Sequence, residues 1–181
     1  QVAGLHLGRQ APVGHRVGRV GALPELLVAG RAVGEQGRAG DHVRGGDELG
    51  YAWYEAGKLA KRTNTFNDFV DAANFLIQQT YTGEGRLVAS GGSAGGTLTG
   101  AVANSAPKLW GAVVSHVPFV DVLNTMLDPN LPLTVGEYEE WGNPAIPEEY
   151  AWMRAYCPYT NLQPADYPAM LVRTALNDSQ V

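Results

Sequence analysis

The sequence predicts an α/β fold, a mostly parallel sheet with helices on both faces, and three observations support it. An apolar run at 86–90 leads into Gly91-Gly92-Ser93-Ala94-Gly95 and then into a helix of small residues at 94–105. A second apolar strand follows at 111–118. Strand, helix and strand within roughly thirty residues indicate a βαβ unit, whose two strands are parallel. A further strand is predicted at 169–176.

The pattern around Ser93 is the first candidate for chemistry. It has the form Gly-x-Ser-x-Gly, with glycines two residues before and two residues after the serine. Such glycines permit a turn so tight that the hydroxyl stands above the end of the sheet, next to the N-terminus of the following helix. A plain glycine-rich turn before a helix is the alternative, since a pattern with three fixed positions recurs by chance.

Composition excludes several classes of protein. The chain has 181 residues, a net charge of -5 and a pI near 5.3, which argues against a nucleic-acid partner. No apolar run approaches the ~18–20 residues of a membrane span, and no segment resembles a signal peptide. The single cysteine, Cys157, cannot form an intrachain disulfide. We therefore expect a structural thiol, a cytoplasmic location, and no metal or cofactor.

Residues 1–40 differ from the rest of the chain. They contain no Phe, Tyr, Trp, Ile, Asp, Ser, Thr, Asn or Lys, although 23–28 could form one short buried element. This composition is typical of a GC-rich frame read out of phase, and a flexible natural extension is the alternative. We predict a boundary here, with a non-homologous, possibly frameshifted or disordered segment at 1–40 and the folded domain at 41–181.

The segment after this boundary predicts a loop and then an amphipathic helix. Arg44 could anchor the glycine-rich loop 42–50, although a solvated arginine is the favoured interpretation. Apolar residues at helical spacing predict a helix at 67–79, with Thr65 and Asp68 as its capping box. The basic residues between loop and helix are interpreted as a solvated face: Lys58, Lys61 and Arg62.

Residues 120–142 are acidic and interrupted by proline and glycine, which predicts an irregular insertion over the carboxyl edge of the sheet. If this segment is extended, Glu137 and Glu139 project the same way and could bind a Lys or Arg side chain. A solvated acidic face is the alternative. His116, at the end of a strand, is interpreted as a packed or capping residue rather than a base.

The last part of the chain predicts a helix at 147–155 and the strand at 169–176. Asp178 follows that strand directly. In the order Ser…Asp…His of α/β-hydrolases, an acid in this place orients the catalytic histidine and stabilises its imidazolium.

From about residue 42 onward the chain resembles the catalytic domain of the oligopeptidase B members of the prolyl oligopeptidase family of serine peptidases. The resemblance rests on these stretches, in order: HVRGGDELG, WYEAGK, NTFNDF, GGSAGG, VPFVDVLNTMLD, PLTVGEYEEWGNP, YCPYTN and LNDSQV. It implies a partial α/β-hydrolase fold and an endopeptidase that cleaves short peptides after Lys or Arg.

The resemblance also implies roles for single residues. Ser93 matches the nucleophile, Asp178 matches the acid of the triad, and the amide of Ala94 matches one donor of the oxyanion hole. Glu137 and Glu139 match the acidic pair that receives the basic P1 side chain. These assignments imply short peptides containing basic residues as the substrates.

Some parts of the family pattern are missing from this sequence. The family's histidine lies some tens of residues beyond the acid, which is past Val181. The family also has, before the stretch that matches residue 42, a tyrosine that donates to the oxyanion, and residues 1–40 contain no tyrosine. The β-propeller, the last strand and the last helix are also absent. We therefore expect a fragment with little or no turnover by itself. The alternatives are an inactive product of a degraded gene, a non-catalytic binding domain, or an acylaminoacyl or dipeptidyl peptidase.

Overall fold

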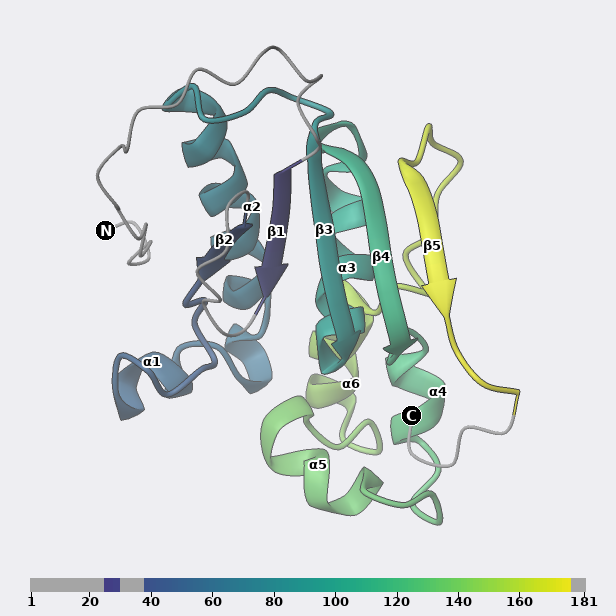
Figure 1. Ribbon diagram of the computed structural model, residues 1–181. Coiled ribbons are helices and arrows are strands. Elements are labelled where there is room, and N and C mark those ends of the chain that lie inside the picture. Colours follow the sequence, from purple (N-terminus) through teal and green to yellow (C-terminus); the bar gives the residue numbers. More distant parts are fainter. Residues whose placement is uncertain (1–24, 30–37, 177–181) are drawn as a thin grey trace.

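The computed structural model describes residues 25–29 and 38–176. In this part of the chain, five parallel strands form one sheet in the order β2-β1-β3-β4-β5 (Figure 1). The predicted α/β class and parallel sheet are thus confirmed. The strands are β1 (Glu25–Ala29), β2 (Arg38–Asp41), β3 (Leu87–Ser93), β4 (Trp110–Pro118) and β5 (Ala169–Arg173).

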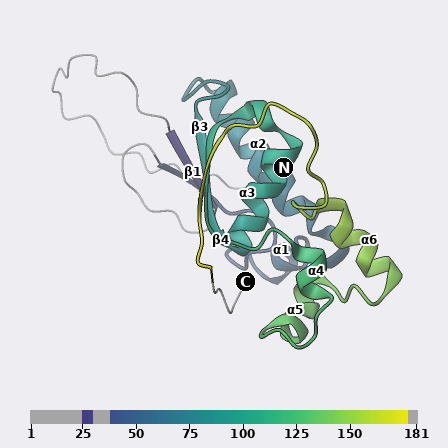
Figure 2. The same ribbon diagram turned by 90° about the vertical axis from the view of Figure 1, so that its right-hand side faces the viewer.

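The helices of the described residues gather on one side of this sheet. Figure 2 shows α2 and α3 along one face of the sheet and no described helix on the other. Helices were predicted on both faces, and in the described part of the chain they cover one. The helices are α1 (Tyr51–Glu55), α2 (Thr63–Gln78), α3 (Ala94–Ser105), α4 (Val122–Met126), α5 (Thr134–Trp141) and α6 (Pro147–Tyr156), with short 3-10 turns η1 (Leu59–Lys61) and η2 (Pro107–Leu109).

The core lies between the sheet and the pair α2 and α3. Phe69 of α2 stacks on Trp110 of β4, with ring centroids 5.5 Å apart. Leu87 and Val102 are fully buried in the same cluster. The predicted apolar face of α2 is therefore confirmed, although the helix begins at Thr63, four residues before the predicted start.

The βαβ unit β3-α3-β4 is present as predicted, and α3 has the predicted bounds. Two polar contacts hold α3 against β4. The buried hydroxyls of Thr99 and Ser115 lie 2.9 Å apart, and the indole of Trp110 donates to the carbonyl of Val102 at 3.2 Å. Both contacts come from the middle and second half of α3, the helix that follows the turn at Ser93.

Arg44 is an anchor, so the favoured interpretation as a solvated arginine is wrong. Asp68 accepts hydrogen bonds from the backbone N–H of Arg44 at 2.9 Å, from Nε at 2.8 Å and from Nη2 at 2.5 Å. The hydroxyl of Thr65 donates to the carbonyl of Arg44 at 2.6 Å. Thr65 and Asp68 therefore hold the loop rather than cap α2, and the predicted capping box is also wrong.

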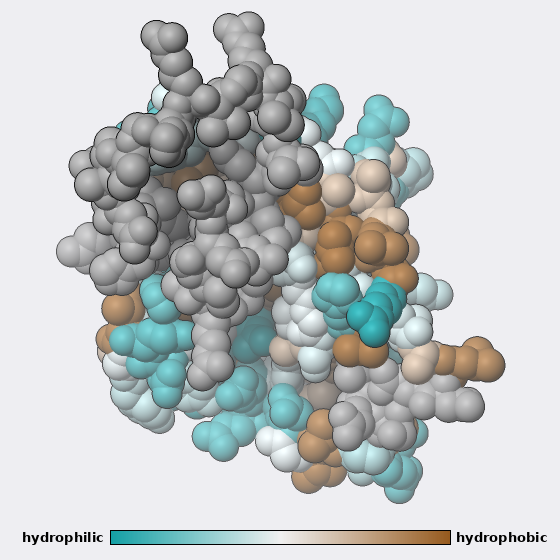
Figure 3. Space-filling model, viewed as in Figure 1, coloured by the Kyte–Doolittle hydropathy of each residue, from teal (hydrophilic) through white to brown (hydrophobic). Residues whose placement is uncertain are grey.

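Strand β5 forms one edge of the sheet among the described strands. Its apolar side chains Met170, Leu171 and Val172 are 49%, 61% and 53% exposed. Figure 3 shows apolar surface gathered on this side of the molecule.

Cys157 is fully buried and accepts a hydrogen bond from the Thr160 hydroxyl at 3.4 Å, which confirms the predicted structural thiol.

Within the described ranges, no helix has the length and apolar character needed to cross a membrane. Those ranges also hold no cluster of His, Cys, Asp and Glu suited to a metal ion.

Candidate active site

Ser93 stands at a strained turn at the carboxyl end of β3. Its backbone has φ 52° and ψ −119°, a region that residues with a side chain rarely adopt. The residue is exposed, and α3 begins at the next position, Ala94. An exposed serine with positive φ between a parallel strand and a helix has the geometry of a nucleophile elbow rather than of a relaxed turn.

Two glycines make this turn possible by close packing. A Cβ atom at Gly91 would collide with the carbonyl of Gly95, and one at Gly96 would collide with Pro118, the last residue of β4. A Cβ at Gly95 would meet no atom within 4 Å. The motif's first glycine is therefore required sterically, whereas the role predicted for Gly95 belongs to Gly96.

A small pocket of about 100 Å³ opens beside Ser93. The elbow, the chain after β4 and the segment 120–142 surround it, so that segment does cover the carboxyl edge of the sheet (Figure 1). The segment is less irregular than predicted, because it contains α4 and α5. The lining includes Ser93, Ala94, Phe119, Met126, Glu137 and Trp141.

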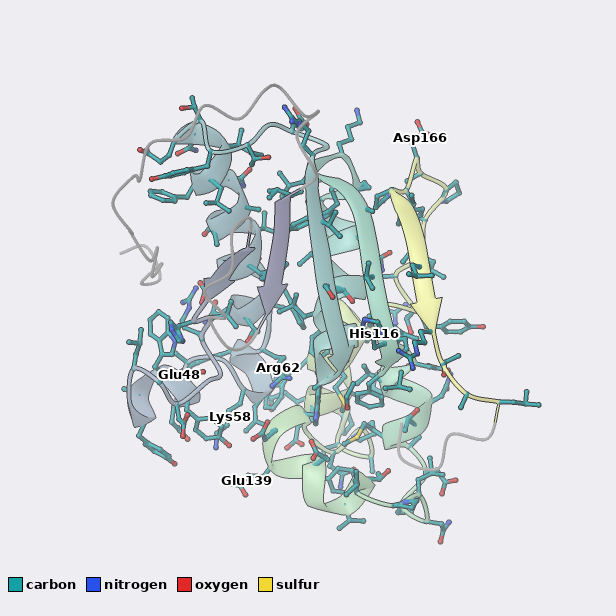
Figure 4. The ribbon with its side chains drawn as sticks, viewed as in Figure 1. Glu48, Lys58, Arg62, His116, Glu139 and Asp166 are labelled. Carbon is teal, nitrogen blue, oxygen red and sulfur yellow. The ribbon has the colours of Figure 1, made fainter. Side chains whose placement is uncertain are left out.

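The two candidate carboxylates do not share a direction. Glu137 and Glu139 lie on α5, where two positions differ by roughly 200° around the helix axis, so the premise of an extended segment is wrong. Glu137 lines the pocket with Ser93. The side chain of Glu139 is 80% exposed, and its carboxylate lies 3.9 Å from the amino group of Lys58 (Figure 4). The structure therefore brings only Glu137 to the serine.

Of the three basic residues interpreted as a solvated face, Lys61 is exposed as predicted, whereas Lys58 and Arg62 are largely buried. The side chains of Lys58 and Arg62 are only 11% and 12% exposed. Arg62 lies over the ring of Trp141, with its guanidinium carbon 3.9 Å from the ring centroid. Burial lowers the pKa of Arg62, and the nearby groups Tyr156, Glu140 and Glu137 oppose that shift.

Trp141 also contributes to this site, although no pattern in the sequence indicated a role for it. Its indole N–H donates to Oε2 of Glu137 at 2.7 Å, across one turn of α5. The spacing of four residues between Glu137 and Trp141 is a helical contact, and recognising α5 as a helix would have revealed it.

Asp178 and His116 were the remaining residues that the sequence offered for chemistry. Asp178 lies outside the described residues. His116 is exposed on β4, opposite Gly92 in the register of β3 and β4, so its expected packing is wrong.

Comparison with known proteins places this site in a family. The model of the prolyl oligopeptidase family matches residues 39–181. The chain belongs to the prolyl oligopeptidase family. Residues 1–38 lie outside that match. The shifted reading frame at 1–40 stays a prediction.

Relatives of known name include a dipeptidyl aminopeptidase BI of Pseudoxanthomonas mexicana, 53% identical over 140 residues, 77% of this chain and 19% of the relative. Among solved structures, oligopeptidase B from Leishmania major is 42% identical, with a TM-score of 0.77 over 83% of this chain and 23% of that one. Oligopeptidase B from Trypanosoma brucei with covalently bound antipain is 38% identical, with a TM-score of 0.80 over 88% of this chain and 25% of that one. The chain thus spans about a fifth to a quarter of these proteins, and its sheet, with the elbow at the end of β3, belongs to their α/β-hydrolase catalytic domain.

Proposed function

We propose that this chain carries the nucleophile of a serine-type endopeptidase that cleaves short peptides after Lys or Arg. The observation that carries the proposal is the strained, exposed Ser93 beside a pocket that Glu137 also lines. A nucleophile and an acidic specificity group on one pocket suit a peptide whose basic side chain enters while its carbonyl meets the serine.

In the proposed reaction, Ser93 Oγ attacks the carbonyl carbon and its proton passes to a histidine, which is proposed to follow the acid in the complete protein. The tetrahedral oxyanion receives a hydrogen bond from the backbone N–H of Ala94, the first residue of α3. The histidine then protonates the leaving amine, and water releases the acyl group from Ser93 by the reverse sequence. Asp178 is proposed to orient that histidine.

Glu137 is proposed as the group that recognises the P1 cation. Glu137 belongs to the pocket lining, and a Lys or Arg side chain entering there would form a charge-assisted hydrogen bond with its carboxylate. Glu139 is proposed in a different role, as an exposed charge that attracts basic peptides from outside the pocket. This role is the weaker one, because the carboxylate of Glu139 already faces the amino group of Lys58.

The name of the relative that is 53% identical favours a second candidate, a dipeptidyl aminopeptidase. Such an enzyme requires a free N-terminus two residues before the scissile bond. Aminomethylcoumarin substrates with the sequence Gly-Arg, with and without a benzyloxycarbonyl block, separate the two functions. An endopeptidase cleaves the blocked substrate, whereas a dipeptidyl aminopeptidase cleaves only the free one.

The experiment should use the complete product of the reading frame that contains these residues. We expect cleavage of blocked Arg and Lys substrates and at least a hundredfold slower cleavage of a substrate with P1 Glu. Equal rates for P1 Arg and P1 Glu would contradict the proposed specificity. An absence of cleavage of every substrate would favour the inactive or non-catalytic alternative.

The acidic composition and the buried thiol of Cys157 support peptides rather than nucleic acid as partners, and a cytoplasmic location. Fractionation of cells with an antibody to this chain would test the location.

A further inference from the structure

The carboxylate of Glu137 is held by a single donor. Trp141 Nε1 donates to Oε2 at 2.7 Å, and none of the hydrogen bonds in the described part of the chain uses the other oxygen, Oε1. A glutamate on a helix surface has several rotamers, and fixing one of them before the substrate arrives removes that entropy cost from binding. The indole N–H therefore holds one rotamer of Glu137, a residue of the pocket lining, and leaves Oε1 without a hydrogen-bond partner among the described residues.

The ring that supplies this donor is itself clamped. Arg62 covers one region of the Trp141 ring at 3.9 Å, and Phe119 meets it edge-on with centroids 5.3 Å apart. Trp141 is only 2% exposed. A cation over an indole face withdraws electron density from the ring, which makes its N–H a stronger donor.

The arrangement also keeps Arg62 from occupying the site that a substrate would use. Arg62 forms an ion pair with Glu140 rather than with Glu137: its Nη1 lies 3.8 Å from Oε2 of Glu140, and its Nε has no hydrogen-bond partner among the described residues. If Arg62 paired directly with Glu137, a substrate cation would have to displace it. The indole between them couples Arg62 to the carboxylate while leaving the carboxylate unpaired with it.

We propose that Trp141 and Arg62 are positioning residues that hold Glu137 for recognition of the P1 cation. The proposal rests on the proposed function, because it assigns to Glu137 the P1 role given above. It adds that the preference for a basic side chain depends on two residues that need not touch the substrate's charge. One is the residue four positions after the carboxylate, and the other lies before α2.

The test measures kcat/KM of the full-length protein for paired substrates with P1 arginine and P1 citrulline, its neutral isostere. The ratio of the two values reports the use of Glu137. We expect Trp141→Phe, which keeps a ring but removes the N–H, to lower this ratio about tenfold, mainly through KM for the arginine substrate. Arg62→Met should lower it about threefold, and Arg62→Lys, which keeps a cation, should restore part of it.

Matched controls are available on α6, away from the pocket lining. Trp152→Phe and Arg154→Met make the same chemical changes as the two test variants and should leave the ratio unchanged. Thermal unfolding of each variant reports folding. If Trp141→Phe does not fold, Arg62→Met and Arg62→Lys still decide the outcome, because they leave the indole in place.

Glu137→Gln separates this inference from the proposed function. If Glu137→Gln leaves the ratio unchanged, the proposed P1 role is wrong and the inference fails with it. If Glu137→Gln lowers the ratio but the Trp141 and Arg62 variants do not, only the inference fails. In the Glu137→Gln background, Trp141→Phe should change the ratio less than twofold, since its target is gone. An undiminished effect there would show that Trp141 acts through packing alone, and would overturn the proposal.

Discussion

Replacing Asp68 with asparagine should destabilise the domain through the loop that Arg44 anchors. The Asp68 side chain is only 7% exposed and accepts from the backbone N–H, Nε and Nη2 of Arg44. Breaking a buried ion pair costs about 3–5 kcal/mol. The Arg44 side chain is 31% exposed, so water recovers part of this cost, and an asparagine oxygen still accepts one bond. We therefore expect a loss of about 2 kcal/mol in the free energy of unfolding.

Urea unfolding followed by circular dichroism measures this loss, which corresponds to a fall of about 4–8 °C in Tm for a domain of this size. Asp71→Asn is the matched control, since Asp71 lies on the same helix with an exposed side chain, and it should cost less than about 0.5 kcal/mol. The combined variant Arg44→Met with Asp68→Asn should cost less than the two single losses added together. Additive losses, or an Asp68→Asn variant as stable as Asp71→Asn, would refute the reasoning.

Two other predictions concern the elbow and a buried phenol. Gly96→Ala should cost about 2–4 kcal/mol in urea unfolding, because its Cβ would meet Pro118, whereas Gly95→Ala, which faces open space, should cost less than about 1 kcal/mol; equal costs would contradict the packing account. Burial raises the pKa of Tyr156 above its ordinary value, and its hydroxyl has no hydrogen-bond partner among the described residues. The unfolded chain therefore loses this proton near pH 10, while the folded chain keeps it. As a result, the free energy of unfolding is unaffected below about pH 10 and falls above it, by up to about 1.4 kcal/mol per pH unit. Tyr156→Phe should flatten that fall between pH 10 and 11 without lowering stability at pH 7, and an unchanged alkaline slope would count against it.

The elbow and the βαβ unit could be predicted from sequence because both are local. Gly91 and Gly96 lie within a few residues of Ser93, and Pro107 ends α3 by a rule that involves only its own neighbours. The apolar runs on either side differ sharply from the small residues of α3. Each of these signals is short in range, and each is present in full within the segment 86–118.

The burial of Arg62 beside the pocket and the anchoring of Arg44 could not be predicted, because the residues that these arginines contact are distant in sequence. Arg62 is buried by Trp141, and Arg44 is paired with Asp68, 24 positions away. Basic residues beside a helix have the same local pattern whether they are solvated or buried. The segment of α5 was judged irregular because Gly136 interrupts it and Pro132 comes just before it, although eight residues there form a helix. With the helix unrecognised, Glu137 and Glu139 appeared equivalent, and the hydrogen bond from Trp141 to Glu137 could not be predicted.

The central claim is that Ser93 is a nucleophile, and covalent labelling tests it most directly. A fluorophosphonate forms an ester with an activated serine Oγ as fluoride leaves, and mass spectrometry of the digested full-length protein locates the added mass. We expect a single modified serine, Ser93, with labelling slowed by a competing P1 arginine peptide and abolished in Ser93→Ala. Labelling that falls on another serine, or that persists in Ser93→Ala, would contradict it.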